Sequence, residues 1–366
     1  MQANSLLTVA MTDPDQLATW SGTPRAINDA FRRLGYSVDG LAANDPRLLD
    51  RAIYTAFGIP FYGRRGRAFR PYYGPLSQRI RTRVAEARGA MPGKPFLHTD
   101  HMWLPFPGLS SHDYLYRDTS WSDYALNQGV GERLRRKVGR DLKLALEKVG
   151  HVFVTSQWAK ECMIDEGAPP ERVSVVGTGA GNFIEPYFGP KDYSNGSTLC
   201  IAKVRHHNKG IDLLLEGFAL ARRANANLTL DLVAPAGMFA KQDGVRFHSN
   251  LSAEALRQLY YESALYAMPA RYEPWGLVYL EAQLASIPIL GSNRAAFPEL
   301  SDHGKSGFIL ERLTARAVAD ALVVAHSDPD GLHAMGQHAR SYASTFSWDR
   351  TVRLMDAVMQ KPALLT

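Results

Sequence analysis

The sequence predicts an α/β protein made of two domains, each built around a parallel sheet. A chain of 366 residues is long for one hydrophobic core, so two domains of ordinary size are expected. Short apolar segments alternate with helical patterns in the second half, which is typical of a parallel sheet with helices on both faces. In such sheets ligands bind beyond the carboxyl ends of the strands.

The first half opens with a comparable unit of strand, loop and helix. An apolar strand is expected at residues 6–11. A helix should follow, with the Thr23 hydroxyl at its cap, Pro24 in its first turn and Gly35 beyond its end. Later elements are expected at residues 96–100 (strand), 141–148 (helix) and 151–156 (strand).

The second half contains the clearer strand pattern. Its strands are expected at residues 199–202, 228–233, 245–247, 266–268, 287–290 and 307–310. A hinge rich in glycine, proline and polar residues is expected within 176–195. The predicted domains are therefore residues 1–176 and 177–345, followed by a C-terminal helix within 346–366 that opens at Trp348.

The composition is that of an ordinary globular protein, with 45% hydrophobic and 21% charged residues. No apolar run reaches about 18 residues, so no membrane-spanning helix is expected. The first residues lack the pattern of a secretory signal. Cys162 and Cys200 cannot form a disulfide framework and lack metal-ligand spacing, so both are expected to be reduced and buried in a cytoplasmic protein.

The formal charge of +6 is unevenly distributed. Residues 51–94 contain ten basic side chains against the single acid Glu86, and a second basic cluster runs from Arg133 to Lys143. Such clusters favour an anionic partner, namely a bilayer surface, a pyrophosphate-linked lipid or nucleic acid. The alternative is a solvated basic face that only aids solubility.

The segment from Arg271 to Glu281 is the most informative part of the chain. Glu273 lies in a loop before a proline and a glycine, and Glu281 lies within the helix that starts near Gly276. The amide end of a helix attracts phosphate, so a loop acid, a phosphate cradle and a helix acid could together bind a nucleotide-sugar. Glu254 and Glu262 have the same spacing but share one helical pattern, residues 252–265, and are interpreted as a solvated face.

This segment and its surroundings resemble the retaining family-4 glycosyltransferases of the GT-B fold, the glycosyl transferases group 1. The resemblance is specific from about Val152 to the end. It is carried by residues 152–156, 171–176, 201–204, 209–214, 282–291, 297–300, 304–309 and 346–348. It implies two Rossmann-like domains whose sheets face across a cleft. The first would bind the acceptor, the second the nucleotide-sugar, and the last helix would pack back on the first domain.

The resemblance also implies roles for residues of the second domain. Lys203 and Lys209 would neutralise the diphosphate and stabilise the leaving nucleotide, although the family usually has arginine where Lys203 stands. Glu273 would face the donor sugar and Glu281 would accept hydrogen bonds from the ribose. The segment between them would also bind the donor, through Trp275, Gly276, Leu277 and Val278.

Four further candidates lie in the first domain. Gly22 and Thr23 follow the first strand, where many relatives bring backbone close to the diphosphate, and a simple helix cap by Thr23 is the alternative. Asp100 is a candidate partner of the acceptor hydroxyl, and His101 a candidate contact of the donor sugar. The aromatic side chains of Trp103, Tyr114, Tyr116 and Trp121 either stack on acceptor sugars or belong to the core.

No essential metal or cofactor is expected. His98, Asp100 and His101 lack a fourth ligand at sensible spacing. Two Asp-x-Asp sequences, at residues 13–15 and 328–330, match a pattern that another glycosyltransferase fold uses for a divalent ion, and the second is interpreted as a turn between helices. No Ser-His-Asp order, Walker loop or G-x-G-x-x-G motif follows a strand, which argues against hydrolases, kinases and dehydrogenases.

The expected activity is retaining transfer of a hexose from a UDP- or GDP-linked sugar. The acceptor would be a saccharide or a lipid-linked acceptor in the synthesis of cell-surface polysaccharide or glycoconjugate. The expected location is the cytoplasm, with peripheral binding at the inner face of the membrane as an extension. Nucleic acid is a disfavoured partner. The alternatives are a nucleotide-sugar epimerase or hydrolase on the same fold, and a non-catalytic GT-B binding subunit.

Overall fold

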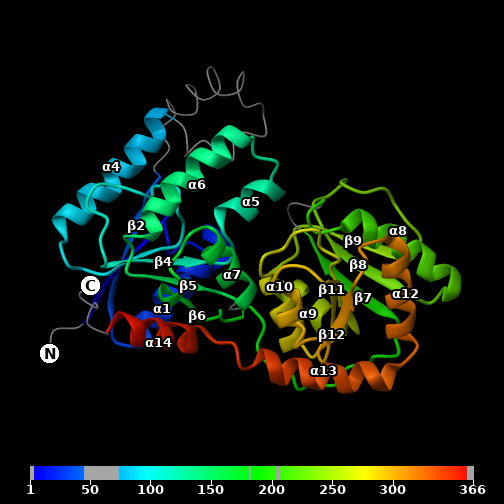
Figure 1. Cartoon of the computed structure of the whole chain (residues 1–366). Coiled ribbons are helices and arrows are strands. Elements are labelled where there is room, and N and C mark those ends of the chain that lie inside the picture. The colour runs from blue at the N-terminus through cyan, green and yellow to red at the C-terminus, as the bar shows by residue number, and fades with distance from the viewer. Residues whose placement is uncertain (1–3, 45–73, 181–182, 203–206, 361–366) are drawn as a thin grey trace. The chain divides into compact units, whose positions relative to one another are not determined.

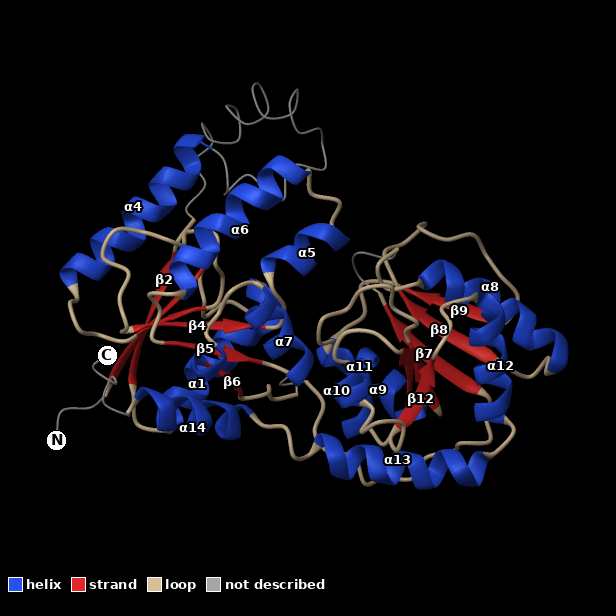
Figure 2. Ribbon diagram, in the orientation of Figure 1, coloured by secondary structure: helices blue, strands red, loops and turns tan. Residues whose placement is uncertain are grey.

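The computed structural model describes residues 4–44, 74–180, 183–202 and 207–360 (Figure 1). The chain forms two compact units. Unit 1 combines residues 1–179 with 348–366, and unit 2 comprises residues 180–347. In each unit a parallel sheet lies between layers of helices (Figure 2). The predicted α/β class is therefore confirmed. No described helix has both the length and the apolar content needed to cross a membrane.

Six described strands form the sheet of unit 1, and every neighbouring pair is parallel. They are β1 (Ser5–Ala10), β2 (Ser37–Ala42), β3 (Phe96–His98), β4 (Asp113–Arg117), β5 (His151–Val154) and β6 (Val173–Val175), in the order β2-β1-β3-β4-β5-β6. From β1 the chain moves to β2 on one side, and it returns to β3 on the other. The connections therefore diverge between β1 and β3, which is where such sheets bind ligands.

Helices cover both faces of the unit 1 sheet. The described ones are η1 (Thr19–Gly22), α1 (Thr23–Arg33), α4 (Gly74–Ala90), α5 (Trp121–Asn127), α6 (Glu132–Leu146), α7 (Gln157–Asp165), η4 (Pro170–Arg172) and α14 (Trp348–Met359). Crossovers between parallel strands are right-handed, so α1 and the helices α4 to α7 lie on opposite faces.

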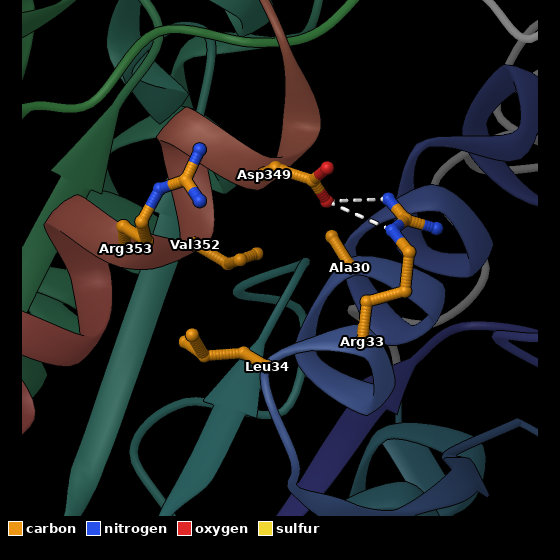
Figure 3. A pocket seen from close by; sticks show the side chains of 6 residues that line it. All are labelled: Ala30, Arg33, Leu34, Asp349, Val352 and Arg353. Atoms are coloured by element: carbon orange, nitrogen blue, oxygen red, sulfur yellow. Dashed lines mark hydrogen bonds and ion pairs between the residues drawn. The ribbon is translucent and has the colours of Figure 1, made fainter.

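The C-terminal helix α14 packs on α1. Arg33 donates hydrogen bonds to the Asp349 carboxylate from Nε at 2.9 Å and from Nη2 at 2.6 Å. A small cavity of about 110 Å³ beside this pair is lined by Ala30, Arg33, Leu34, Asp349, Val352 and Arg353 (Figure 3).

Unit 2 also has six described strands, all parallel to their neighbours. They are β7 (Ser197–Ile201), β8 (Thr229–Val233), β9 (Val245–His248), β10 (Leu265–Ala267), β11 (Ile289–Ser292) and β12 (Gly307–Leu310), in the order β12-β11-β10-β7-β8-β9. In chain order this is the dinucleotide-binding arrangement 3-2-1-4-5-6, with its point of divergence between β7 and β10.

The helices of unit 2 form two layers. The described ones are α8 (Ile211–Ala224), α9 (Ala253–Glu262), α10 (Leu277–Leu284), α11 (Phe297–Leu300), α12 (Ala315–His326) and α13 (Pro329–Ala343). Helix α8 packs on α12, and α10 packs on α13. The connections through α9 and α10 run in the opposite direction across the sheet from the one through α8, so right-handed crossovers place α9 and α10 on the face opposite α8.

The predicted strands of unit 2 are confirmed with shifts of up to two residues at their ends, but several other predictions need correction. The helix predicted at 141–148 begins nine residues earlier, at Glu132, and ends at Leu146. The helical pattern predicted through Leu265 ends at Glu262, because Leu265 already belongs to β10. Strands β2 and β4 were not predicted. β2 is a largely exposed edge strand. Asp39 and Gly40 interrupt its apolar residues, so it lacks the apolar run of a central strand.

Candidate functional site

Two loops meet at the point of divergence in unit 2, one after β7 and one after β10. The backbone amides of Arg271 and Tyr272 both donate to the carbonyl of Asn208, at 2.7 and 3.0 Å. The Arg271 guanidinium also forms a two-pronged pair with Asp212, with both N···O distances at 2.6 Å. These contacts fix the position of one loop relative to the other.

Gly210 makes this close approach feasible. Its φ is +67°, and a Cβ atom at this position would lie 1.9 Å from the carbonyl oxygen of Pro269. Any other residue would be strained in this backbone conformation and would also collide with the second loop. Gly210 at the start of α8 is therefore required by packing, and its close contact with the Pro269 loop places Lys209 beside Glu273.

Lys209 and Glu273 form an ion pair at this junction. The distance from Nζ to Oε2 is 3.4 Å, and the two side chains are 14% and 24% exposed, so both remain open to a ligand. The structure thus brings together two predicted site residues that are 64 positions apart in the sequence. Lys203, the other predicted cation, lies outside the described residues.

The start of α10 is close to this junction in the chain, because the helix begins only four residues after Glu273. Gly276 is the N-cap, with φ of 87° and no side-chain cap, and the first turn contains no acid. The amide end of the helix therefore keeps its partial positive charge for an anion. Leu277 and Val278 are half-buried in this first turn. Trp275, directly before the N-cap, is buried, and its Nε1 has no hydrogen-bond partner among the described residues.

Glu281 is half-buried on the second turn of α10. Its Oε2 accepts a hydrogen bond of 2.8 Å from the hydroxyl of Tyr260 on α9. Tyr260 is fully buried, and this burial, reinforced by the nearby Glu281 charge, holds the pKa of its hydroxyl well above the ordinary value. Sequence reasoning missed Tyr260, because α9 gave only an amphipathic pattern and no motif.

Glu254 and Glu262 have the same spacing as Glu273 and Glu281, and they lie on a solvated helix face, as predicted. Both side chains are exposed on α9. Glu254 pairs with Arg257 at 2.6 Å, and Glu262 accepts a hydrogen bond from Gln258 at 2.7 Å. These are ordinary contacts of a solvated helix face.

In unit 1 the loop between β1 and α1 has an unusual backbone. Trp20, Ser21 and Gly22 all have positive φ, at 40°, 55° and 80°. Gly22 is the N-cap of α1 and no side chain caps the helix. The prediction that Thr23 caps α1 is therefore wrong, because Thr23 is already the first helical residue and its side chain is buried.

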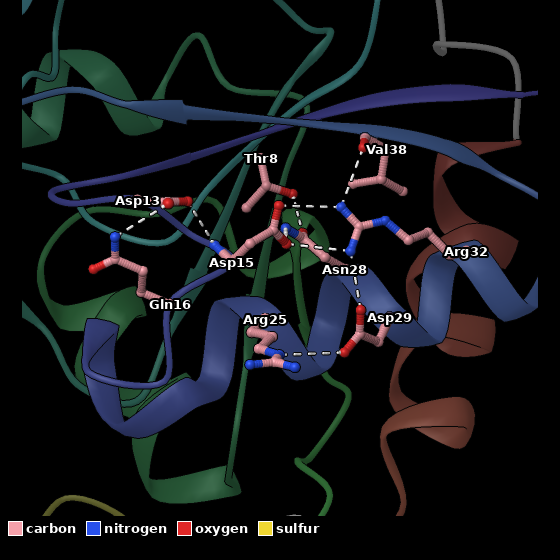
Figure 4. Close-up of polar contacts among 9 residues, drawn as sticks. All are labelled: Thr8, Asp13, Asp15, Gln16, Arg25, Asn28, Asp29, Arg32 and Val38. Atoms are coloured by element: carbon pink, nitrogen blue, oxygen red, sulfur yellow. Dashed lines mark hydrogen bonds and ion pairs between the residues drawn. The ribbon is translucent and has the colours of Figure 1, made fainter.

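Asp15 anchors this loop to α1 (Figure 4). Its carboxylate accepts hydrogen bonds from Asn28 at 2.9 Å and from Arg32 at 3.2 Å, and Asn28 in turn accepts one from Thr8 at 2.6 Å. Burial alone would raise the pKa of Asp15, but the bonds from Arg32 and Asn28 outweigh it and hold the pKa below its ordinary value. The sequence 13–15 is thus a loop anchor.

The second Asp-x-Asp sequence connects α12 and α13, as interpreted. Asp328 is the N-cap of α13, and its side chain accepts a hydrogen bond of 2.9 Å from the backbone amide of Gly331. Across the described ranges, no group of three or more histidine, cysteine, aspartate or glutamate side chains is placed to hold a metal ion.

His98 belongs to a buried polar network in the core of unit 1. Its Nε2 lies 2.8 Å from Asp113, and its Nδ1 accepts a hydrogen bond of 2.9 Å from Trp103. Asp113 also pairs with Arg88 at 2.7 Å. These side chains are all buried, so His98 supports the strand end and is not available to a ligand.

Asp100 and His101 follow β3 at the point of divergence of unit 1. The backbone amide of His101 donates to Asp100 Oδ1 at 2.6 Å, and Arg117 Nη1 lies 3.7 Å from the same oxygen. Burial raises the pKa of Asp100. Burial, followed by the charge of Arg117, lowers the pKa of His101 well below its ordinary value, so the ring is neutral near pH 7.

The aromatic side chains of this region divide into two groups. Trp103, Tyr116 and Trp121 are fully buried, so the alternative that they stack on acceptor sugars is wrong for these three. Tyr114 is half-buried.

Three of the known proteins that are similar to this chain bear on its fold and function. Over 229 residues the chain is 28% identical to a D-inositol 3-phosphate glycosyltransferase of Gordonia bronchialis, which covers 55% of this chain and 50% of that protein. A sucrose-phosphate synthase of Thermosynechococcus elongatus superposes with a TM-score of 0.69 and 16% identity, covering 98% of both chains. Anabaena Alr3699/HepE in complex with UDP and glucose superposes with a TM-score of 0.68 and 17% identity, covering 98% of this chain and 100% of that chain.

The chain spans about half the length, or less, of the curated relatives that it matches. Residues 196–328 match the family model described as glycosyl transferases group 1. This range contains every candidate residue of unit 2. The similar solved structures cover both units and share the two-sheet architecture of the GT-B glycosyltransferases. Residues 196–328 are therefore similar to the glycosyl transferases group 1, and the chain has the GT-B fold, as the resemblance in its sequence implied.

Proposed function

We propose that this protein is a retaining glycosyltransferase that moves a hexose from a nucleoside-diphosphate sugar to a saccharide or lipid-linked acceptor. The Lys209–Glu273 ion pair carries the proposal, because it sets a cation and a carboxylate 3.4 Å apart at the point of divergence of unit 2. The UDP and glucose named with Anabaena Alr3699/HepE make a UDP-linked hexose the first donor to test, with the GDP-linked sugar second.

The donor diphosphate is assigned to Lys209 and the amide end of α10. A diphosphate arriving beside Lys209 would displace the Glu273 carboxylate from the ammonium, since two anions compete for one cation. Glu273 would then turn to the sugar hydroxyls. Gly276, Leu277 and Val278 would offer backbone amides to the phosphate oxygens, and Trp275 would pack beneath them. Glu281, one helical turn further along, would accept the ribose hydroxyls. Lys203 is the second cation in this proposal.

The chemistry follows from the leaving group. The bond between the anomeric carbon and the diphosphate oxygen breaks, and its electron pair leaves with the diphosphate. The acceptor hydroxyl oxygen forms the new bond to that carbon on the same face, and its proton passes to the departing diphosphate oxygen. Lys209 stabilises the developing negative charge, so the protein supplies charge stabilisation and orientation and needs no covalent nucleophile. No metal is required for this proposal.

Acceptor binding is assigned to unit 1. Asp100 and His101 lie at its point of divergence. Gly22 and Thr23, in the loop after β1, are proposed to bind the donor through backbone that approaches its diphosphate. Asp100 is proposed to accept the hydrogen bond of the attacking hydroxyl and His101, as a neutral ring, to contact the donor sugar. The relatives named as D-inositol 3-phosphate glycosyltransferases add a phosphorylated polyol to the acceptors worth testing.

An anionic membrane surface is proposed as a further partner of unit 1. Helix α6 exposes Arg133, Arg136, Lys137, Arg140 and Lys143, whereas its apolar residues Leu134, Val138 and Leu142 are buried in the core. Attachment would therefore be electrostatic, without insertion of the helix. Co-sedimentation with phosphatidylglycerol vesicles that weakens as salt rises supports this partner. Equal sedimentation with phosphatidylcholine vesicles contradicts it.

The transfer proposal is tested with UDP-hexoses and GDP-hexoses against an acceptor panel of oligosaccharides, lipid-linked saccharides and inositol 3-phosphate. Release of nucleoside diphosphate that requires an acceptor, with a product of the donor's anomeric configuration by NMR, supports it. Release without acceptor would indicate an epimerase or hydrolase instead. Inversion of configuration would overturn the retaining mechanism. Nucleotide binding without consumption of any donor would indicate a binding subunit.

A further inference from the structure

The hydroxyl of Tyr260 donates a hydrogen bond to the Glu281 carboxylate. The donor oxygen lies 2.8 Å from Oε2, and the two residues come from different helices, α9 and α10. Tyr260 has no exposed surface. A buried phenol that donates to a carboxylate makes a charge-assisted hydrogen bond, which is shorter and stronger than a bond between neutral groups.

The position of Tyr260 is itself fixed on several sides. Its ring stacks on Tyr266 of β10 at 6.4 Å, with 12° between the ring planes, and Phe183 lies 6.3 Å away. The Lys191 ammonium donates to the carbonyls of Tyr260, Tyr261 and Ser263, at 2.9, 2.9 and 2.8 Å. These carbonyls belong to the last turn of α9 and to its C-cap Ser263, where carbonyl groups lack a partner within the helix and need a donor from outside it. These contacts hold Tyr260 in place, with its hydroxyl directed at Glu281.

We infer that Tyr260 is a positioning residue that orients the Glu281 carboxylate toward the vicinal hydroxyls of the ribose. The inference rests on the proposed function, in which Glu281 binds the ribose of the donor nucleotide. Tyr260 itself does not touch the ligand. It fixes the rotation of the carboxylate, so that Glu281 can accept hydrogen bonds from two adjacent hydroxyls without first losing rotational freedom.

The chemistry of the phenol suits this task. Because burial holds the pKa of Tyr260 well above its ordinary value, the hydroxyl stays protonated across the working range and can only act as donor toward a carboxylate.

The test compares binding of UDP with binding of its 2′-deoxy and 3′-deoxy analogues, or the GDP series if the wild type binds GDP only. Isothermal titration is carried out on the full chain for the wild type, Tyr260→Phe, Glu281→Ala and the double variant. Tyr193→Phe is the matched control, because Tyr193 is also buried and its hydroxyl donates at 2.6 Å to the carbonyl of Ser286.

The wild type is expected to bind the ribonucleotide at least about tenfold more tightly than the deoxy analogues, since a buried acceptor left without its donor is costly. Tyr260→Phe should weaken UDP binding about tenfold and leave binding of the analogues within about twofold, so that discrimination is lost. Tyr193→Phe should retain it. Adding Tyr260→Phe to Glu281→Ala should change nothing further.

Each outcome decides one of the two claims. If the wild type binds UDP or GDP and Tyr260→Phe discriminates ribose as well as the wild type does, the inference is overturned while the proposed function stands. The inference is also overturned if Tyr260→Phe weakens the binding of all nucleotides by the same factor. It is overturned as well if Tyr260→Phe weakens UDP binding as much in the Glu281→Ala background as in the wild type. Either result would indicate a merely structural role. If the wild type binds no nucleotide, the proposed function fails and the inference fails with it. If Tyr260→Phe has a lower melting temperature than the Tyr193→Phe control, the double-variant comparison is made at a temperature where the Tyr260→Phe protein and the double variant are both folded.

Discussion

The backbone of Gly210 and the carbonyl of Pro269 are in such close contact that a Cβ atom on Gly210 would lie 1.9 Å from the Pro269 oxygen. This contact joins the loop after β7 to the loop after β10. Arg271 reinforces it by donating from its backbone to Asn208 and from its guanidinium to Asp212. The position of Lys209 relative to Glu273 is therefore a consequence of backbone packing, and it does not depend on the ion pair itself.

Gly210→Ala should separate the two loops. The methyl group would meet the Pro269 carbonyl, and the φ of +67° would be strained, so we expect a loss of at least about 2 kcal/mol in the free energy of unfolding and most of the donor affinity. Gly237→Ala is the control, because Gly237 has φ of +71° but nothing within 4 Å of its added Cβ. Urea unfolding and nucleotide titration compare the two, and an equal effect of both variants would contradict the contact's role.

Lys209→Ala and Glu273→Ala should each reduce turnover by roughly a hundredfold or more, since one would lose charge stabilisation of the leaving diphosphate and the other the contact with the sugar. Glu254→Ala removes an exposed acid of the control pair on α9 and should leave turnover unchanged. Initial rates of nucleoside diphosphate release measure all three. Rates for Lys209→Ala or Glu273→Ala within twofold of the wild type would rule out the assigned roles.

Arg88→Met should destabilise unit 1 by about 3–5 kcal/mol, because it leaves the Asp113 carboxylate buried beside His98 without its cation. Arg316→Met is the comparison. It breaks an exposed pair with Asp320 and should cost less than about 0.5 kcal/mol. Chemical denaturation followed by circular dichroism measures both. A loss below about 1 kcal/mol for Arg88→Met would show that the network does not support the strand end before Asp100.

His326 should make unit 2 sensitive to acid. Its ring is buried beside the Thr198 hydroxyl, 2.9 Å from Nε2, and burial lowers its pKa from 6.5 to about 4. Between these two values the unfolded chain binds more protons than the folded one. Stability is therefore fully present above about pH 6.5 and falls as pH drops toward 4, with a slope of at most about 1.4 kcal/mol per pH unit.

His326→Gln removes this titration and places an amide beside Thr198 in place of the imidazole ring. The difference in unfolding free energy between the wild type and this variant should therefore shrink or change sign as pH falls from 6.5 to 4. His303→Gln, at an exposed position, is the control and should follow the wild type at every pH. A difference between the wild type and His326→Gln that stays constant over this range would refute the buried titration.

Much of the second unit could be predicted from the sequence, because β7, β8, β10 and β11 are largely buried apolar runs separated by glycine and polar turns. The meeting of Lys209 and Glu273 also followed from general rules, since parallel strands end at one edge of a sheet and β7 and β10 are neighbours. General rules could not predict that Gly210 approaches Pro269 so closely that an added Cβ would lie 1.9 Å from the Pro269 oxygen, because this depends on the local path of the Pro269 loop.

Other features were not predictable because they depend on pairings across the fold. Tyr260 and Glu281 lie on separate helices, and neither helix pattern indicates which buried hydroxyl meets which acid. His98 was weighed as a metal ligand and set aside for want of a fourth ligand, but its actual partners, Asp113 and Trp103, could not be predicted because they reach it only through tertiary packing. Thr23 looked like a helix cap because hydroxyls favour that position, but the left-handed backbone from Trp20 to Gly22 moves the cap one residue earlier.

The central claim, a donor nucleotide site at Lys209, Glu273 and Glu281, is tested most directly by thermal unfolding with a panel of nucleoside diphosphates and their hexoses in metal-free buffer. We predict that one nucleoside diphosphate and its sugar raise the melting temperature by several degrees. We also predict that Glu281→Ala abolishes the shift and that Glu254→Ala preserves it. No shift with any nucleotide, or an equal shift in Glu281→Ala, would contradict the assignment of this site.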